Sequence, residues 1–226
     1  MITIAIDGPS GSGKSTISKI IAKKMGFINV DTGALYRTIA YFFLENKINY
    51  KEKSEVLKNL NNISVSLKNE NFSQTIFLNG VDVTQKIRTN EISMVSSEIS
   101  VIPEVRQFLL KLQRDIAEKN NIVIDGRDIG TVVIPNADVK IFLTAEPKVR
   151  AKRRYNQLIS KGQSTTFDEI LELINKRDYN DIHRKISPLK KANDAILVDN
   201  SNLNQKNTVD KLMEIIEKKG IKIDAK

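Results

Sequence analysis

The apolar positions near the start of the chain change from a continuous run to a helical spacing. Residues 2–6, ITIAI, form a short β-branched run that predicts a buried strand, and a glycine-rich loop follows it. From Ser15 onward the apolar positions recur at helical spacing, and Gly26 marks the expected end of that helix. The opening pattern therefore predicts a strand, a loop and a helix in that order.

A different pattern interrupts the chain further on. The run FINV predicts a short strand that ends at Asp31, and a helix follows it, but residues 63–83 alternate between apolar and polar positions. Asn79 and Gly80 stand between two apolar runs there, and both tolerate the positive φ angles of a tight turn. We expect an inserted antiparallel hairpin, followed by a helix that continues through Ser97.

The alternation of strands and helices resumes toward the C-terminus. Three more apolar runs predict strands, one ending at Asp125 and the others at residues 139–145 and 195–199, with helices between and after them. Thr166 and Glu169 have the spacing of a capping box at the start of one of these helices. Five short apolar strands separated by helices favour an α/β fold with one parallel sheet that helices cover on both faces.

Composition narrows the classes of protein that fit this pattern. The chain has 226 residues, of which 40% are hydrophobic, which suits one substantial core with a smaller appended module. It has no cysteine and no run of 18 apolar residues, so we expect neither a disulfide nor a membrane span. The N-terminal run lacks the basic flank of a signal peptide.

The formal net charge of +9 at pH 7 allows two interpretations. A basic surface can bind nucleic acid through its phosphates, whereas a basic cleft can bind small phosphorylated substrates. Basic residues crowd residues 146–191, but acids lie among them, and the interleaved aromatics of a single-strand binder are missing. We favour small substrates and expect no nucleic-acid partner.

The glycine-rich segment IDGPSGSGKST contains the full pattern G-x-x-x-x-G-K-[ST] of a P-loop. Its glycines let backbone N–H groups surround an anion, and the start of the following helix adds positive potential. Lys14 is expected to reach the β- and γ-phosphates of a nucleoside triphosphate, and Ser15 to ligate Mg²⁺. The need for a nucleoside triphosphate predicts a cytoplasmic protein. The predicted ATP-binding residues are Gly8, Pro9, Ser10, Gly11, Ser12, Gly13, Lys14, Ser15 and Thr16.

A second carboxylate could serve the same metal. Asp125 ends the apolar run IVID, as the acid of a Walker-B-like strand does. It either faces the Mg²⁺ region, directly or through water, or caps the loop that follows. The residue pattern leaves both readings open.

Arginines are expected at the edge of the sheet where ligands bind. Arg37 and Arg127 follow two strands at their carboxyl ends, which is the ligand crevice of open α/β sheets. Arg177, Asp181 and Arg184 have the spacing of one helix face, which is also typical of ion pairs on a solvated surface. Many arginines beside a P-loop suit two phosphate groups that meet, a donor triphosphate and an acceptor phosphate.

The chain offers little for catalysis by a strong base. Its one histidine, His183, lies among charged residues in the middle of a predicted helix and is expected at the surface. An acceptor phosphate oxygen is already anionic and needs no base. The sequence therefore favours a nucleotide kinase over a kinase that acts on a neutral hydroxyl.

Several segments together have the order found in one enzyme family: IDGPSGSGKST, DTGALYR, IRTNEIS, IPEVRQFLLKLQR, DGRDIGTVV, KIFLTA, RAKRR and KRDYNDIHRKISPLKKANDAILVD. Through them the chain resembles the bacterial cytidylate kinases, a group of nucleoside monophosphate kinases. DTGALYR and DGRDIGTVV are specific to this group as a pair, whereas a P-loop alone is not. The resemblance covers nearly the whole chain.

This resemblance implies roles that the residue pattern alone does not assign. Ser97, Arg106 and Asp128 look like cytosine readers, since Asp128 and Ser97 can accept from the exocyclic amine while Arg106 donates to N3 and O2. The implied CMP-binding residues are Thr32, Tyr36, Arg37, Ser97, Arg106, Arg127, Asp128, Arg177, Asp181 and Arg184. The implied catalytic residues are Lys14, Arg127, Arg153 and Arg184, with Arg153 in a lid that closes over ATP.

The resemblance also implies the layout and the reaction. One P-loop kinase domain would span residues 1–226, with its core at 1–58, 99–150 and 190–226, a monophosphate-binding insert at about 59–98 and a short lid at about 151–166. It would be a monomer that uses ATP and Mg²⁺ to phosphorylate CMP and dCMP, without a covalent enzyme intermediate. The alternatives are a kinase for UMP, AMP or dTMP and, in another class, a P-loop switch or a nucleic-acid-binding ATPase.

Overall fold

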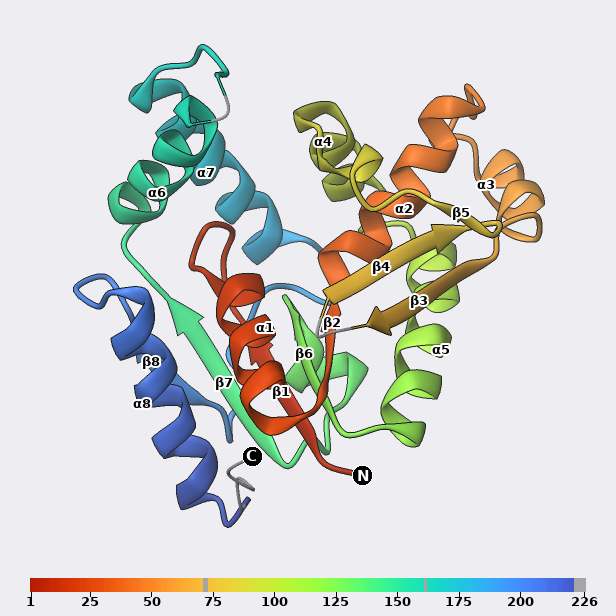
Figure 1. The fold of residues 1–226 in the computed structure, drawn as a ribbon. Coiled ribbons are helices and arrows are strands. Elements are labelled where there is room, and N and C mark those ends of the chain that lie inside the picture. Colours follow the sequence, from red (N-terminus) through yellow and green to blue (C-terminus); the bar gives the residue numbers. More distant parts are fainter. Residues whose placement is uncertain (71–72, 161, 222–226) are drawn as a thin grey trace.

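A five-stranded sheet lies at the centre of the computed structural model, which describes residues 1–70, 73–160 and 162–221 (Figure 1). All of its strand pairings are parallel, and the strand order is β2-β6-β1-β7-β8. The predicted parallel sheet is confirmed. Its strands are β1 (Thr3–Asp7), β2 (Ile28–Asp31), β6 (Ile122–Gly126), β7 (Val139–Thr144) and β8 (Ile196–Asp199).

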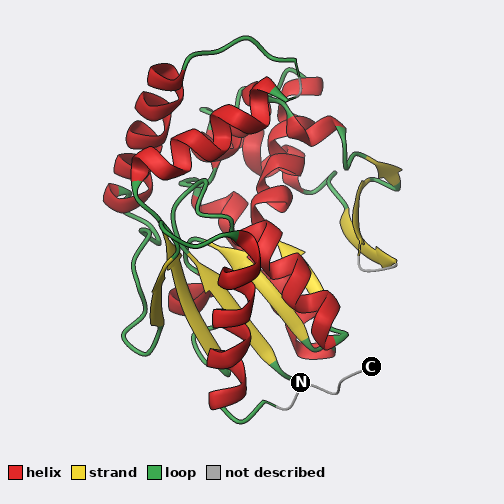
Figure 2. Cartoon of the chain, turned by 60° about the vertical axis from the view of Figure 1, so that its left-hand side comes forward, coloured by secondary structure: helices red, strands yellow, loops and turns green. Residues whose placement is uncertain are grey.

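Helices cover both faces of this sheet, as Figure 2 shows. Ile4 and Ile6 point to the face where helices α1 (Lys14–Met25) and α8 (Gln205–Lys218) pack. Ala5, which points the opposite way, belongs to the core under α2 (Thr32–Glu45) and α5 (Pro103–Lys119). Successive side chains along a strand therefore belong to two separate cores, one on each face of the sheet.

Two further helices form a separate small unit. Helices α6 (Pro147–Ile159) and α7 (Phe167–His183) pack on each other through a small core of their own that includes Ala151 and Ile174. The predicted capping box of Thr166 and Glu169 is present at the start of α7. Figure 1 shows this pair at the upper left, on the side of the molecule opposite the second sheet.

The second sheet is antiparallel and has three strands. They are β3 (Val65–Glu70), β4 (Ser73–Leu78) and β5 (Val81–Asp82), in that order across the sheet. Asn79 and Gly80 form the two-residue turn between β4 and β5, with φ angles of 49° and 81°. The hairpin prediction is confirmed at this turn. The remaining elements of this region are α3 (Lys53–Leu60), the 3₁₀ turn η1 (Lys86–Arg88) and α4 (Asn90–Ile99).

Three local expectations were wrong. Between β6 and β7 the expected helix is only a π-helical turn, η2 (Ile129–Val133), because β-branched residues and Pro135 disfavour a longer helix there. His183 is the last residue of α7, not a mid-helix residue, although it is exposed as expected. Arg184 lies just beyond the helix, with φ −62° and ψ 139°, so it does not share a helical face with Arg177 and Asp181.

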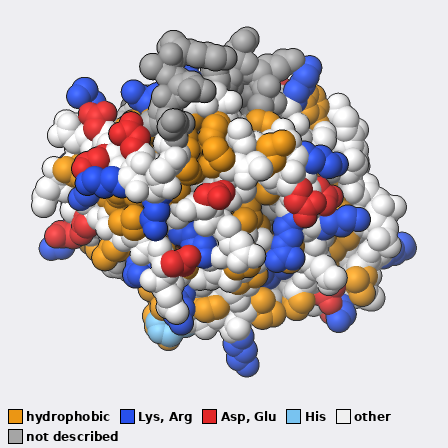
Figure 3. Space-filling view, turned by 90° about the horizontal axis from the view of Figure 1, so that it is seen from below, with side chains coloured by type: hydrophobic (Ala, Val, Ile, Leu, Met, Phe, Trp, Pro, Cys, Tyr) orange, Lys and Arg blue, Asp and Glu red, His pale blue; other side chains and the backbone are white. Residues whose placement is uncertain are grey.

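The described helices and one face of the molecule bear on the expectations about membranes and charge. No helix in the described residues is long and apolar enough to cross a bilayer. On the face seen in Figure 3, lysine and arginine side chains lie among acidic and apolar ones. The positive charge of the chain is therefore dispersed over the part of this face that is described.

Candidate active site

The P-loop joins β1 to α1, in the context that the sequence predicted. Gly8, Gly11 and Gly13 have φ angles of 150°, 76° and 92°, which side chains with a Cβ rarely adopt. A Cβ on Gly8 would lie 2.0 Å from the carbonyl oxygen of Leu143, so the first glycine is also required for space. The loop thus curls tightly at the N-terminus of α1, where backbone N–H groups and the helix dipole favour an anion.

Lys14 is buried inside this loop, with only 5% of its surface exposed. Its Nζ donates to the carbonyl oxygen of Pro9 at 2.7 Å and to Oγ of Ser12 at 3.4 Å. Burial lowers the pKa of Lys14 well below its usual value, and the positive charge of Arg127 adds to this effect. A buried cation in this state gains strongly from a nearby anion.

Two side chains from outside the P-loop hold its backbone. Arg150 of α6 donates to the carbonyl oxygen of Ser10 at 2.9 Å, and Asn200 donates to that of Ser12 at 3.0 Å. The side-chain and backbone oxygens of Asn200 also accept from Arg153, at 3.1 and 2.8 Å. Asn200 therefore links Arg153, a predicted catalytic residue, to the P-loop.

Ser15 and Asp125 meet beside the P-loop. Ser15 Oγ donates to Oδ2 of Asp125 at 2.7 Å, so the carboxylate faces the predicted metal region. The other oxygen of Asp125, Oδ1, is buried and has no hydrogen-bond partner. Burial, and then the charge of Asp31, raise the pKa of Asp125 to about 7. Thr32 donates to the backbone carbonyl oxygen of Asp125 at 2.8 Å.

An arginine cluster lies at the same edge of the sheet, and we define it as Arg37, Arg127, Arg177 and Arg184. Arg37 pairs with Asp31 at 3.0 Å, and Arg127 pairs with Asp181 at 2.8 Å. They come from α2, from the segment after β6, from α7 and from the residue just beyond α7. The fold thus brings together arginines that lie far apart in the sequence.

Arg177 has the least compensated charge of this cluster. Its Nε is buried and has no hydrogen-bond partner. Burial, and then the charge of Arg127, lower the pKa of Arg177 to about 10, while Asp181 opposes the change. A buried guanidinium with a free donor indicates that this part of the site is built for an anion.

Asp128 connects the arginine cluster to Arg106. Its Oδ2 accepts from Nη2 of Arg106, and its Oδ1 lies 3.5 Å from Nη2 of Arg184. The Arg106 guanidinium lies 6.0 Å from the centre of the Tyr36 ring, and burial raises the pKa of Tyr36 to about 12. The predicted readers Arg106 and Asp128 and the predicted CMP-binding residue Tyr36 are therefore neighbours.

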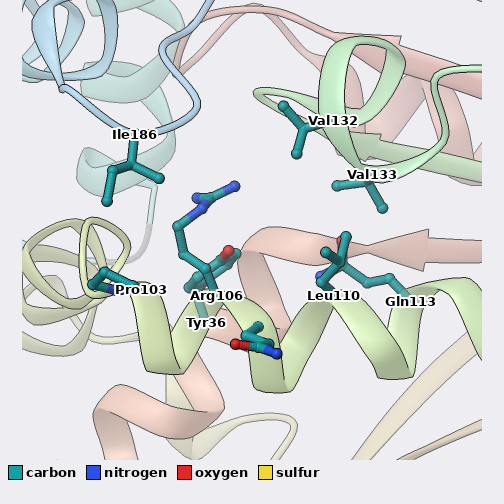
Figure 4. A pocket seen from close by; sticks show the side chains of 9 residues that line it. Tyr36, Pro103, Arg106, Leu110, Gln113, Val132, Val133 and Ile186 are labelled. Atoms are coloured by element: carbon teal, nitrogen blue, oxygen red, sulfur yellow. The ribbon is translucent and has the colours of Figure 1, made fainter.

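A pocket of about 310 Å³ opens beside Arg106, between α5, the end of η2 and Ile186 (Figure 4). Most of its lining residues are apolar, and Tyr36 and Arg106 are among them. The Arg106–Asp128 pair beside the pocket is poorly solvated, because its side chains are only 10% and 7% exposed. The lining residues are Tyr36, Pro103, Arg106, Gln107, Leu110, Gln113, Val132, Val133 and Ile186.

Two predicted residues have weaker connections to this site. Ser97 is half-buried in α4, and its backbone carbonyl oxygen accepts from Oγ of Ser100 at 2.7 Å. Ser100, which the sequence did not single out, is connected more directly. Its carbonyl oxygen accepts from Arg106, and its Oγ lies 3.4 Å from Nη1 of Arg184. Thr16 is exposed in the first turn of α1.

A comparison with protein families decides what this site belongs to. The sequence model of a family described as cytidylate kinase matches residues 4–218. The chain belongs to the cytidylate kinase family. It is therefore an enzyme of the nucleoside monophosphate kinase type, and this family membership implies ATP-dependent phosphorylation of CMP.

Individual relatives agree over nearly the full length. A cytidylate kinase of Fusobacterium nucleatum is 48% identical over 217 residues, which are 96% of this chain and 98% of that protein. A cytidylate kinase of Caldicellulosiruptor saccharolyticus is 46% identical over 217 residues, or 96% of each chain. An uncharacterized protein from Eubacterium ventriosum has a similar fold, with a TM-score of 0.52, 14% identity and coverage of 96% and 99%.

Sequence reasoning missed several residues that support the cytidylate kinase site. Arg150, Asn200 and Ser100 each bond directly to the P-loop or to a predicted arginine. Arg150 opens the RAKRR segment and was visible as one basic residue among many, whereas Asn200 and Ser100 belong to no recognised pattern. Their roles depend on contacts between distant segments, which local spacing does not encode.

Proposed function

We propose that this protein transfers the γ-phosphoryl group of ATP in one step to the monophosphate of CMP or dCMP. The products are ADP and CDP or dCDP, and no covalent enzyme intermediate forms. The proposal is carried by one observation: β1 leads into the P-loop, and its neighbour β6 leads into Arg127 and Asp128. Cationic groups for a donor triphosphate and for an acceptor phosphate thus flank a single edge of the sheet.

The P-loop side is proposed to hold ATP and Mg²⁺. The backbone of residues 8–16 and Lys14 would bind the phosphates of ATP. Ser15 and Asp125 fit a magnesium ion, because they place hydroxyl and carboxylate oxygens together and leave one buried carboxylate oxygen without a partner. When bound, Mg²⁺ would neutralise charge on the β- and γ-phosphates. Few protein ligands are needed, since magnesium keeps waters and phosphate oxygens in its shell.

The arginine cluster is proposed to hold the acceptor phosphate. Planar guanidinium groups bind phosphate oxygens in pairs, which fixes the orientation of the acceptor as well as its position. Asp181 keeps Arg127 oriented through the 2.8 Å ion pair, while Arg177 contributes a free buried donor. Thr32, next to Asp125, completes the acceptor side.

Catalysis then rests on positioning and on charge. The attacking phosphate oxygen is anionic, so no side chain has to remove a proton from it. Lys14, Arg127 and Arg184 are proposed to stabilise the transferred group, because fixed positive charges in a dry site act most strongly in the transition state. Arg153 is proposed as the fourth such cation, since Asn200 links it to the P-loop.

The base is proposed to be read beside Arg106. Cytosine carries an exocyclic amine where uracil carries a carbonyl, so an acceptor such as Asp128 distinguishes the two. Arg106 would donate to N3 and O2, Ser97 would accept from the amine, and Tyr36 would pack on the ring. The ion pair of Arg106 with Asp128 presets this donor and acceptor arrangement.

We also propose the organisation and setting of the enzyme. Residues of about 59–98 would move as the monophosphate-binding insert, and residues of about 151–166 as the lid over ATP. A single chain supplies both substrate sides of the site, which supports a monomer. Small nucleotides are the proposed partners, without nucleic acid, and the use of ATP supports a cytoplasmic location.

An acceptor panel tests the reaction. ADP release from ATP·Mg²⁺ is measured with CMP, dCMP, UMP, AMP, dTMP and no acceptor. We expect high turnover with CMP and dCMP and little with the others. Turnover that ignores the acceptor would instead support a P-loop switch or a nucleic-acid-binding ATPase, and a preference for another monophosphate would support a different kinase.

The single-step transfer has a test of its own. ATP that is chiral at the γ-phosphorus should give CDP with inverted configuration, because one in-line displacement inverts the phosphorus. Retention of configuration would reveal two displacements and hence a phosphorylated enzyme.

A further inference from the structure

Asp7, the last residue of β1, is a buried carboxylate that the proposed reaction does not use. Only 4% of its surface is exposed. Its Oδ1 accepts from the backbone N–H of Ile129 and its Oδ2 from that of Gly130, each at 2.8 Å. These are the first two N–H groups of η2. Asp128, the residue just before η2, does not cap them with its own side chain. Asp7 therefore caps a turn that lies far from it in the sequence.

The same residue anchors the segment before that turn. Asp7 is paired with Gly126 in the parallel ladder between β1 and β6. The chain is thus fixed to Asp7 at Gly126 through the backbone, and again at Ile129 and Gly130 through the carboxylate. Arg127 and Asp128 are the two residues between these anchors.

The other neighbour of Asp7 is the P-loop, since Gly8 follows it directly. One residue thus connects the backbone that holds the donor with the two residues that hold the acceptor and its base. We propose that Asp7 is a positioning residue, which sets Arg127 and Asp128 in register with the P-loop; this inference rests on the proposed function.

The cost of burying this carboxylate supports a specific role. Burial raises the pKa of Asp7 to about 6, although the bonds from Gly130 and Ile129 oppose the change. The two hydrogen bonds thus do not compensate fully for the lost hydration. Only a carboxylate offers two oxygens that can each accept one of two adjacent N–H groups.

Asp7→Asn tests this role with almost no change in size. The amide keeps one acceptor oxygen but places an NH₂ group against a backbone N–H, so one of the two anchors is lost. We expect the ratio of kcat/KM for CMP to that for UMP to fall about tenfold, because Asp128 is no longer held in place. The dissociation constant for ATP, measured without an acceptor, should stay within about twofold, because the P-loop keeps its own supports.

Asp138→Asn is the matched control. Oδ2 of Asp138 accepts from the backbone N–H and the hydroxyl of Thr3, at 2.7 and 3.0 Å, at the other end of β1. This substitution makes the same chemical change at a carboxylate that lies just before β7 and bonds to the far end of β1, away from the site, and it should leave the CMP-to-UMP ratio unchanged. If Asp7→Asn does not fold, Asp7→Glu is compared in its place, since it keeps both acceptor oxygens but displaces them by one methylene.

The outcomes separate this inference from the function on which it rests. An unmodified protein without a preference for CMP over UMP would overturn the proposed function and the role of Asp7 with it. A preference that is present in the unmodified protein and equally present in the Asp7 variant would overturn the role of Asp7 alone. Equal losses of ATP affinity and of CMP selectivity would also overturn it, since Asp7 would then merely support the fold.

Discussion

The two sides of this active site are built in different ways. The P-loop itself comes from one continuous segment, residues 8–16, and its geometry rests on glycine φ angles and backbone groups. The proposed acceptor side draws its side chains from α2, α4, α5, the segment after β6, α7 and the residue just beyond α7. A local backbone motif thus faces a set of charged side chains that only the tertiary fold brings together.

The difference extends to how charge is balanced. Lys14 bonds to a backbone carbonyl oxygen of its own loop, whereas Arg37, Arg106, Arg127 and Arg184 are each paired with an aspartate. Neutral P-loop contacts leave the lysine available to the donor phosphates. The paired arginines are instead oriented in advance, but each guanidinium must then divide its N–H donors between its aspartate and the incoming phosphate. Changes on the two sides should therefore have different kinetic signatures.

The largest effect is expected for Lys14→Ala. Loss of this cation should lower kcat by about a thousandfold, because its charge is felt most in the transition state. Its burial already depresses its pKa, so its removal should not lower the melting temperature. Steady-state kinetics and thermal denaturation measure the two quantities, and a kcat near that of the unmodified protein would refute the role of the P-loop in catalysis.

Arg127→Met should be next in size. We expect kcat/KM for CMP to fall about a hundredfold, because the acceptor loses a guanidinium and Asp181 loses its partner at 2.8 Å. The KM for ATP should change little. Initial rates with each substrate varied in turn give both constants, and an effect confined to ATP would assign Arg127 to the donor side instead.

Asp128→Ala should act on selectivity more than on rate. Arg106 would lose its carboxylate partner, and the acceptor for the cytosine amine would be gone. The CMP-to-UMP ratio of kcat/KM is expected to fall about 10- to 100-fold. An unchanged ratio in a competition assay would show that the base is read elsewhere.

Asn200→Ala should have the smallest effect and should fall on the donor side. The variant loses the bond to the carbonyl oxygen of Ser12 and the side-chain bond from Arg153, while Arg153 keeps its bond to the backbone carbonyl oxygen of residue 200. We expect the KM for ATP to rise about two- to fivefold, with no change in the CMP-to-UMP ratio. A loss of selectivity in this variant would contradict the division of the site into two sides.

The same contrast explains how much the sequence could predict. The P-loop, the five parallel strands and the turn at Asn79 and Gly80 follow from short-range rules, and the structure has them. The helix α3 was not predicted, because only Val56 and Leu60 of its residues are buried and so its apolar stripe is short. The turn η2 differs from the expected helix for a local reason as well, its β-branched residues and Pro135.

The residue pattern predicted arginines and an acceptor phosphate at this edge of the sheet, whereas the roles of the individual residues came from the resemblance. Arg177, Asp181 and Arg184 were expected on one helical face, yet Arg184 lies beyond the end of α7 and still reaches Asp128 at 3.5 Å. The contacts of Ser100, Asn200 and Asp7 join segments that are far apart in the chain. No periodicity encodes such contacts, because the energy that favours them appears only after the sheet has formed.

The most direct test of this account is the affinity of Arg184→Met for each substrate, measured by titration calorimetry against the unmodified protein. The account predicts that CMP binds at least about tenfold more weakly, because a buried charged contact is lost, while ATP·Mg²⁺ binds within about twofold of the unmodified value. Equal losses for both nucleotides, or a loss for ATP·Mg²⁺ alone, would contradict an acceptor side that is separate from the P-loop.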